Sequence, residues 1–262
     1  MPVNDELGKR MKRYEAIPQI SLMRRTPVAI RIDGKAFHTF TKHLNKPWDY
    51  IFQGAMQETM KYLCQNIQNC VFGYQQSDEI TLILVDYDTL NTDAWFGYEV
   101  QKLCSIAASM ATMKFNQKFT ELAVMWYEDF REEWHHDPKD EAYAAALEVC
   151  VNRGAMFDAR CFNIPKEEVT NLVYWRQIDA IRNSIQSNGQ AKFTHSELMN
   201  KNTSQVKDML KQIGYDWDTI PICAQRGVAC IKEENGWKLD FTMPILKDEG
   251  RAYVDDLIFI GD

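Results

Sequence analysis

The sequence has few of the features that mark secreted, membrane or zinc-binding proteins. Its seven cysteines form no Cys-x-x-Cys pair, and their number is odd, which favours reduced core thiols over a disulfide framework. They stand at positions 64, 70, 104, 150, 161, 223 and 230. No apolar run reaches membrane-spanning length, and the N-terminus, MPVNDELGKRMKRYE, is too polar for a signal peptide. We expect a cytoplasmic protein with no membrane partner.

Basic charge is also scarce, because 30 lysines and arginines face 37 aspartates and glutamates. The net charge of −7 and the isoelectric point near 5.4 argue against a generic basic nucleic-acid binder, although a local basic patch can still hold RNA. At 262 residues, 45% of them hydrophobic, the chain suits one large domain or two small ones with a shared core. We find no repeat, low-complexity tract or clear linker.

The segment PVAIRID, which starts at Pro27, alternates in the way of a β-strand. Val28, Ile30 and Ile32 share one face. Arg31 and Asp33 point to the other, and the glycine that follows permits a turn. The segment CVFGYQQSDEITLILVD reads as a hairpin, because two β-rich runs flank a polar turn.

The periodicity of the remaining chain predicts a mixed fold. Helices are expected over 4–17, 49–68, 94–119, 167–186 and 203–214, and further strands over 155–164, 226–232 and 236–246. For the helix over 203–214, Thr203 or Ser204 is the expected N-cap and Gly214 the stop. We expect an α+β fold: an antiparallel sheet with helices on one face in the first half, then a mostly helical part with a short strand pair.

Three carboxylates fall at strand ends. Asp33 ends the first strand, and Asp78 and Glu79 lie at the hairpin turn, after Ser77. If the two ends lie at the same sheet edge, the carboxylates need a counter-charge, which a divalent cation can supply. Such a site suits phosphoryl or nucleotidyl transfer, and Gly34 would allow close approach of a phosphate. Ordinary turn chemistry is the alternative interpretation of the same residues.

Five separated motifs extend this pattern: RIDGKAFHTF, NKPWD, GYQQSDE, FDARCF and YWRQIDAIRNS. Together and in this order they resemble the tRNA-histidine guanylyltransferase family, over about residues 12–231. The resemblance implies a palm-like, ferredoxin-like catalytic core over 1–165, with an N-terminal helix and a helical insertion near 120–150. It also implies a mainly helical, RNA-contacting part over 166–262, two Mg²⁺ ions and a homotetramer.

The resemblance also implies roles for individual residues. Asp33, Gly34 and Asp78 would hold the metal ions, and Glu79 would be a third catalytic residue. The expected nucleotide-binding residues are Arg31, Lys35, Ala36, Phe37, His38, Lys46, Ser77 and Lys102. The expected RNA contacts are Arg25, Arg153, Arg160, Arg176, Arg182 and Asn183, with Arg24, Lys9, Arg10, Lys12 and Arg13 as further candidates.

Two departures from the family pattern bear on the reaction. Trp48 replaces the asparagine of the family's KPND motif, and Ile181 replaces the histidine of the eukaryotic HINNLY motif, which is associated with choosing the histidine tRNA. The second change favours the guanylyltransferase-like branch, which repairs 5′-truncated tRNAs by templated 3′–5′ addition. His135 and His136, which precede Asp137, suggest no metal site, and we expect them at the surface.

The leading prediction is therefore a nucleotidyltransferase acting on tRNA 5′ ends with ATP, GTP or other nucleoside triphosphates as substrates. A 5′-monophosphate would be activated by ATP, and the 3′-hydroxyl of an incoming nucleotide would then attack it. Addition of the extra 5′ guanosine to histidine tRNA, a palm-type nucleotide cyclase and a non-catalytic RNA-binding module are the alternatives.

Overall fold

A computed structural model describes residues 6–132 and 137–260 of the chain. The prediction for His135 and His136 lies outside the described residues. In the described part, six strands form one antiparallel sheet in the order β4-β1-β3-β2-β5-β6. The strands are β1 (Val28–Gly34), β2 (Cys70–Gln76), β3 (Glu79–Leu84), β4 (Phe157–Asn163), β5 (Val228–Glu233) and β6 (Gly236–Asp240).

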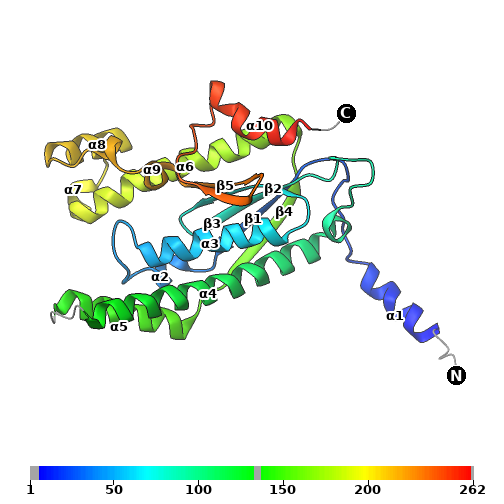
Figure 1. The fold of residues 1–262 in the computed structure, drawn as a ribbon, viewed down its shortest axis with the longest axis horizontal. Coiled ribbons are helices and arrows are strands. Elements are labelled where there is room, and N and C mark those ends of the chain that lie inside the picture. Colours follow the sequence, from blue (N-terminus) through cyan, green and yellow to red (C-terminus); the bar gives the residue numbers. More distant parts are fainter. Residues whose placement is uncertain (1–5, 133–136, 261–262) are drawn as a thin grey trace.

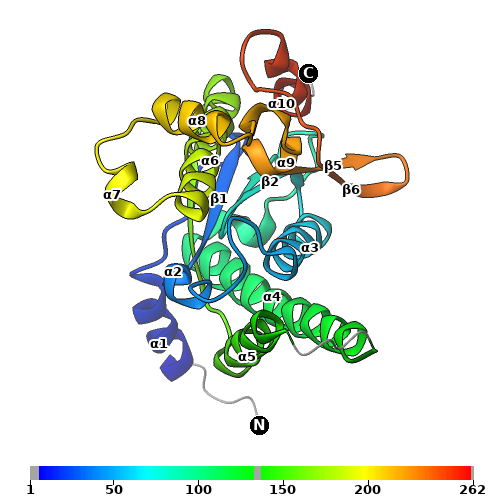
Figure 2. The same ribbon diagram turned by 90° about the vertical axis from the view of Figure 1, so that its left-hand side faces the viewer.

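Helices cover both faces of this sheet. The helices of the described part are α1 (Glu6–Ala16), α2 (Phe37–Phe40), α3 (Tyr50–Asn66), α4 (Val100–Glu132), α5 (Pro138–Arg153), α6 (Lys166–Lys192), α7 (His195–Leu198), α8 (Thr203–Gln212), α9 (Ile222–Arg226) and α10 (Ala252–Ile258). Short 3₁₀ turns lie at Trp95–Tyr98, Trp217–Thr219 and Asp248–Arg251. Helices α3, α4 and α5 lie on one side of the sheet, and α6, α8 and α10 on the other (Figures 1 and 2).

The alternation in β1 places Val28, Ile30 and Ile32 on one face, as the sequence predicts, and a second apolar core lies on the other face. Val28, Ile30 and Ile32 are fully buried in the cluster that α3 and α4 complete. Ala29 lies in the opposite cluster, which Val173 of α6 helps to form. The first half of the chain thus places its helices on one face, and the second half covers the other. Strand β5 pairs with β2, so the second half also extends the sheet.

Helix α4 is longer than the periodicity predicts. It runs to Glu132, and α5 then folds back along it, so the charged and aromatic segment over 126–149 supplies the end of α4 and much of α5. The ring of Trp126 on α4 stands perpendicular to the ring of Tyr143 on α5, with centroids 4.9 Å apart. This aromatic contact joins the two helices.

The N-terminus of α8 corrects one prediction. The cap is Asn202, not Thr203 or Ser204, because the Asn202 side chain accepts from the N–H of Gln205 while the Gln205 side chain accepts from the Asn202 N–H. This reciprocal pair satisfies two N–H groups and so outcompetes a single hydroxyl. Gly214 ends the helix, as expected, with a φ of +80°.

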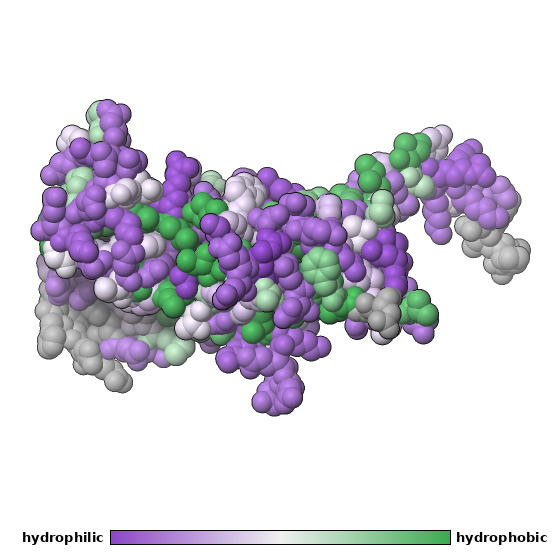
Figure 3. All heavy atoms as spheres, turned by 90° about the horizontal axis from the view of Figure 1, so that it is seen from above, coloured by the Kyte–Doolittle hydropathy of each residue, from purple (hydrophilic) through white to green (hydrophobic). Residues whose placement is uncertain are grey.

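Helix α1 extends away from the body of the protein, and none of its residues is buried (Figure 1). Figure 3 shows the arm with both hydrophilic and hydrophobic residues at its surface, among them the exposed Leu7, Met11 and Tyr14. All seven cysteines lie in the described part and are free thiols. Within residues 6–132 and 137–260, no helix is long and apolar enough to cross a membrane.

Candidate catalytic and nucleotide-binding site

The end of β1 and the β2–β3 turn meet at one edge of the sheet. Asp33 stands opposite Glu79 in the β1–β3 register, and the N–H of Gly34 donates to the carbonyl oxygen of Asp78 at 3.2 Å. The turn between the two hairpin strands consists of Ser77 and Asp78. The Ser77 hydroxyl donates to the Asp78 carboxylate at 3.0 Å. Two of the predicted carboxylates, Asp33 and Asp78, are therefore neighbours.

Two residues at this edge hold a backbone conformation that L-amino acids rarely adopt. Ser77 has a φ of +49°, and Ala36 has φ and ψ of +56° and +37°. Such left-handed residues cost about 1 kcal/mol or more each and cluster at functional sites. In the described part of the chain, the backbone N–H groups of Ala36, Phe37 and His38 donate no hydrogen bond to a protein acceptor. A left-handed residue before a helical one turns successive N–H groups toward one concavity, which suits an anion.

Gly34 is needed for this turn because Phe37 packs onto it. A Cβ atom on Gly34 would lie 2.2 Å from the Phe37 ring, which is closer than any real contact. The ring itself is 3% exposed and lies among other phenylalanines, including Phe115 at a centroid distance of 5.6 Å. The aromatic cluster thus fixes the main chain that follows β1, and Phe37 contributes to the site through packing.

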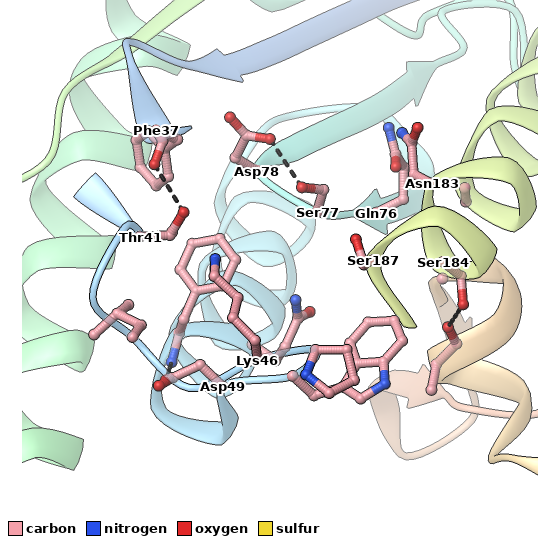
Figure 4. A pocket seen from close by; sticks show the side chains of 18 of the residues that line it. Phe37, Thr41, Lys46, Asp49, Gln76, Ser77, Asp78, Asn183, Ser184 and Ser187 are labelled. Atoms are coloured by element: carbon pink, nitrogen blue, oxygen red, sulfur yellow. Dashed lines mark hydrogen bonds between the residues drawn. The ribbon is translucent and has the colours of Figure 1, made fainter. Parts of the chain in front are cut away.

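A cavity of about 700 Å³ opens at this edge. Its walls are the ends of β1 and β2–β3, the segment before α3, and one side of α6 and α9. Figure 4 shows Lys46 and Asp78 at the cavity, with Ser187 and Asn183 approaching from α6. The volume falls in the range of about 300–1,000 Å³ that is usual for small-molecule sites.

The electrostatics of the acidic edge favour a cationic ligand. Burial raises the pKa of Asp78, and the negative charges of Asp33 and Glu79 raise it further, against the lowering effect of the Ser77 hydrogen bond. Without a bound cation, ionisation of Asp78 is therefore less favourable than in water. A cation beside Asp78 and Asp33 would stabilise the ionised form.

Glu79 lies in a different arrangement from the two aspartates. It is 5% exposed and forms ion pairs with Arg31 at 2.8 Å and with Arg176 at 2.7 Å. Arg176 also pairs with Asp179 at 3.0 Å. Both guanidinium groups lie over the ring of Trp175, 5.7 Å and 4.5 Å from its centroid. The Glu79 carboxylate is thus neutralised by protein groups, and this network anchors α6 to the start of β3.

The structure divides the predicted nucleotide-binding residues into two groups. Those that line the cavity are Ala36, Phe37, His38, Lys46 and Ser77. Arg31, Lys35 and Lys102 do not line it. Arg31 is held by Glu79, Lys35 is exposed, and Lys102 forms an ion pair with Glu99 at 3.0 Å.

Among the predicted RNA contacts, Asn183 lines the cavity and Arg182 is exposed beside it on α6. Arg160 lies 4.0 Å from Asp33 and 3.3 Å from Asp158. Arg176 is buried, and Arg25 donates to the carbonyl oxygen of Thr89.

The remaining predicted RNA contacts lie away from the cavity. Arg153 lies in a separate groove at α5. Arg24 pairs with Asp86 at 2.7 Å, and the four basic residues of α1 are exposed.

Sequence reasoning missed Asp49, whose carboxylate holds one wall of the cavity in place. It is 4% exposed and accepts hydrogen bonds from the N–H groups of Asn45 and Phe52 and from the hydroxyl of Tyr143. The signal was an aspartate directly before an apolar helical pattern, which is a typical N-cap. Its neighbour Trp48 is half-buried and lines the cavity, but belongs to none of the apolar clusters of the described residues.

Comparison with known proteins shows the family of this chain. A family model of the tRNAHis guanylyltransferase (Thg1) matches residues 8–165. A bacterial tRNA(His) guanylyltransferase-like protein solved with ATP is 37% identical, over 98% of this chain and all of that one, with a TM-score of 0.80. In its complex with GTP the TM-score is 0.77, at the same identity and coverage. The Saccharomyces cerevisiae tRNA(His) guanylyltransferase shares the fold, at 20% identity and a TM-score of 0.62 over 87% of this chain and 93% of that one.

The matched family and the likeness over the whole chain define a nucleotidyltransferase. The chain belongs to the tRNAHis guanylyltransferase family, whose model covers more than half of its residues. The family resemblance seen in the sequence motifs is thereby confirmed, and so is the α+β fold with an antiparallel sheet.

Proposed function

We propose that this protein is a template-dependent 3′–5′ nucleotidyltransferase that adds nucleotides to the 5′ end of truncated tRNA. One observation carries the proposal: Asp33 and Asp78 meet at the wall of a cavity that is large enough for a nucleotide. Donor groups for phosphates line the same cavity, on the segment from Ala36 to Lys46. The bacterial relative that was solved with ATP and with GTP supports nucleotides as ligands.

The residues of the cavity suggest how a triphosphate is held. The N–H groups of Ala36, Phe37 and His38 would donate to phosphate oxygens, because they turn toward one concavity and have no protein acceptor in the described residues. The ammonium group of Lys46 would neutralise phosphate charge. Trp48 lines the cavity and is not used in the apolar core of the described residues. Its ring would stack on a base, as aromatic side chains do with unpaired bases.

The carboxylates of the acidic edge would hold two Mg²⁺ ions together with substrate phosphates. Within residues 6–132 and 137–260 no group of three or more histidine, cysteine, aspartate or glutamate side chains could enclose a metal ion. Two carboxylates are nevertheless enough for Mg²⁺, which is bound by one or two carboxylates plus substrate phosphates and water. Asp33, Asp78 and the Gly34 carbonyl would hold the ions, which supply charge neutralisation for phosphoryl transfer when bound.

The protein's own task is positioning in both stages of the proposed reaction. In the first, a 5′-monophosphate end attacks the triphosphate of ATP, and pyrophosphate leaves. In the second, the 3′-hydroxyl of the incoming nucleotide loses its proton and attacks the activated 5′ phosphate, and AMP leaves. Lys46 and the N–H groups after β1 would hold the phosphates in line, and the opposing RNA strand would select the base by pairing.

Ile181 supports repair over obligatory recognition of the histidine tRNA. It replaces the histidine of the eukaryotic motif and packs against the small apolar cluster that α6 forms with α8. An isoleucine side chain has no hydrogen-bond donor, so it cannot donate to RNA as a histidine does. Addition of the extra 5′ guanosine to histidine tRNA is the alternative reaction, because the family model is named for it.

We further propose the larger arrangement that the resemblance implies. The connectivity β1-α3-β2-β3-α4-β4 supports a palm-like, ferredoxin-like core over 1–165, and 166–262 would be the RNA-contacting part. The exposed apolar residues of α1 support assembly into a homotetramer. Seven free thiols suit work in the cytoplasm, which is reducing.

The test is an extension assay with Mg²⁺, the four nucleoside triphosphates and a 5′-monophosphorylated tRNA that lacks its first nucleotide. We expect addition that follows the opposing base, with no preference for the histidine tRNA over another tRNA. Extension of the histidine tRNA alone, by one guanosine, would establish the alternative reaction. No extension, even from a 5′-triphosphorylated RNA, would refute the proposal.

A further inference from the structure

A second cavity of about 540 Å³ lies between α2 and α5. Its floor is apolar and includes Phe40, Ala146 and Val149, the last of which is 62% exposed. Three basic side chains, His43, Lys139 and Arg153, line it and are exposed. No carboxylate lines it among the described residues. We refer to this cavity as the α2–α5 groove.

The groove gathers cations on a protein whose net charge is −7. Lys139 and Arg153 form no ion pair with a described carboxylate, and neither does His43. The two unpaired cations Lys139 and Arg153 in one groove of an acidic protein create a local positive potential, which favours a polyanion.

The groove lies beside the candidate catalytic cavity. The two cavities flank the segment from Thr39 to Lys46, and Asn45 lines both. The same segment carries Lys42, an exposed cation that lines neither cavity. Asp49 fixes this boundary, because its buried carboxylate joins the N–H of Asn45 to the hydroxyl of Tyr143 on α5. The two cavities are therefore adjacent, and the residues between them are held in place by hydrogen bonds.

We propose that the α2–α5 groove binds the phosphate backbone of the RNA strand that enters the catalytic cavity. The inference rests on the proposed function, which places the 5′ end of an RNA beside Asp33 and Asp78. Lys139 and Arg153 would contact phosphates, while the apolar floor around Val149 would accept ribose and base faces. Phosphate contacts fix the register of an RNA without reading its sequence, as a repair enzyme that serves many tRNAs requires.

The test measures RNA binding separately from catalysis. Fluorescence anisotropy would give the affinity for a 5′-monophosphorylated acceptor-stem minihelix over a series of KCl concentrations, and a separate titration would give the affinity for ATP. The groove variant is Lys139→Ala/Arg153→Ala. The matched control is Lys61→Ala/Lys114→Ala, which removes the same charge from two partly exposed lysines on α3 and α4 that line neither cavity.

We expect the groove variant to bind the minihelix roughly tenfold more weakly, or worse, at 0.1 M salt. Its plot of log affinity against log salt should be shallower by about 1.4–1.8, since each lost phosphate contact removes about 0.7–0.9. Its affinity for ATP should equal that of the wild type, and the control variant should match the wild type in both titrations.

Equal minihelix affinity and salt slope in the groove and control variants would overturn the inference. A loss of ATP affinity in the groove variant would also overturn it, and would assign the groove to a free nucleotide. The proposed function is judged separately by extension with the wild type. If the wild type extends RNA and the groove variant binds normally, the groove inference alone fails. If the wild type binds RNA through the groove but extends nothing, the proposed function alone fails.

Discussion

The N–H of Gly34 donates to the carbonyl oxygen of Asp78 at 3.2 Å, and this bond joins the end of β1 to the β2–β3 turn. Because the bond lies within the main chain, the sheet sets the separation of the Asp33 and Asp78 backbones. The protein therefore holds the two carboxylate-bearing residues next to each other before any ligand binds. Such preorganisation lowers the cost of assembling a phosphoryl-transfer site.

Replacing either aspartate should abolish transfer without unfolding the protein. We expect Asp33→Ala and Asp78→Ala to lose about 10³-fold or more in single-turnover extension, which corresponds to about 4 kcal/mol of transition-state stabilisation. The control is Asp158→Ala, an exposed carboxylate that stands opposite Asp33 in the β1–β4 register but does not line the cavity. Wild-type rates in Asp33→Ala or Asp78→Ala would remove the metal-binding proposal.

Asp78→Asn should stabilise the protein at pH 7 when no divalent cation is bound. The pKa of Asp78 is raised by burial and by neighbouring charge, so folding gains from this carboxyl when it is protonated. That gain is complete below the ordinary aspartate pKa of about 3.9 and is lost as the pH rises through the raised folded pKa. The asparagine side chain of the variant is uncharged at every pH, so the variant does not lose this stability as the pH rises.

In thermal melts without divalent cations, we expect the Asp78→Asn variant to unfold roughly 2 °C or more above the wild type at pH 7. The difference should vanish near pH 3. Mg²⁺ should raise the melting temperature of the wild type more than that of the variant. A variant that melts lower than the wild type at pH 7 would show that ionised Asp78 is stabilising.

Arg176 should matter for stability more than for RNA affinity. Its guanidinium is buried between Glu79 and Asp179, and removing one partner of a buried pair typically costs about 3–5 kcal/mol. We expect Arg176→Gln to lower the melting temperature by roughly 6 °C or more. Glu79→Gln/Arg176→Gln should lose less than the sum of the single changes, because the two groups interact. A shallower salt slope for RNA at unchanged stability would instead support a phosphate contact.

Gly34→Ala should damage both fold and activity. The added methyl would lie 2.2 Å from the Phe37 ring, and an overpacked core typically costs about 1–3 kcal/mol. The matched control is Gly54→Ala in α3, where the new Cβ would meet only the flexible Leu122 side chain at 3.1 Å. Since alanine favours a helix, the control should be neutral or more stable. Comparable melting temperatures for the two variants would show that the Phe37 ring can move aside.

Local patterns predicted most of the fold, because alternation and helical periodicity report which face of an element is buried. The strand that carries Asp33, the hairpin and α6 follow from such patterns. The full length of α4 did not, because its last turns pack against α5 through the Trp126–Tyr143 contact, and a charged, aromatic segment gives no clear periodicity. The cap at Asn202 was missed because three cap-forming residues stand in a row, and only the partner Gln205 decides among them.

The parts of the site that sheet pairing positions were predictable from the sequence. The parts that depend on side-chain contacts between residues far apart in the sequence were not. Asp33, Asp78 and Ser77 come together because sheet pairing brings strand ends to one edge. The pairing of Glu79 with Arg176 joins residues 97 positions apart, and no local pattern encodes it. The buried role of Asp49 depends on Tyr143, 94 positions away, in the same manner.

Helix α6 is continuous over 27 residues, and three residues on one side of it make different contacts. Val173 completes the second core, Arg176 binds Glu79, and Ser187 faces the cavity. Each residue of an α-helix turns by about 100°, so one inserted residue between Arg176 and Ser187 would rotate the cavity wall away while the core contact remained. Homologues should therefore vary in the lengths of their surface loops but keep the count of residues in this helix. An insertion between Arg176 and Ser187 would keep both residues on the same side of the helix only if it added about one whole turn, roughly 3.6 residues.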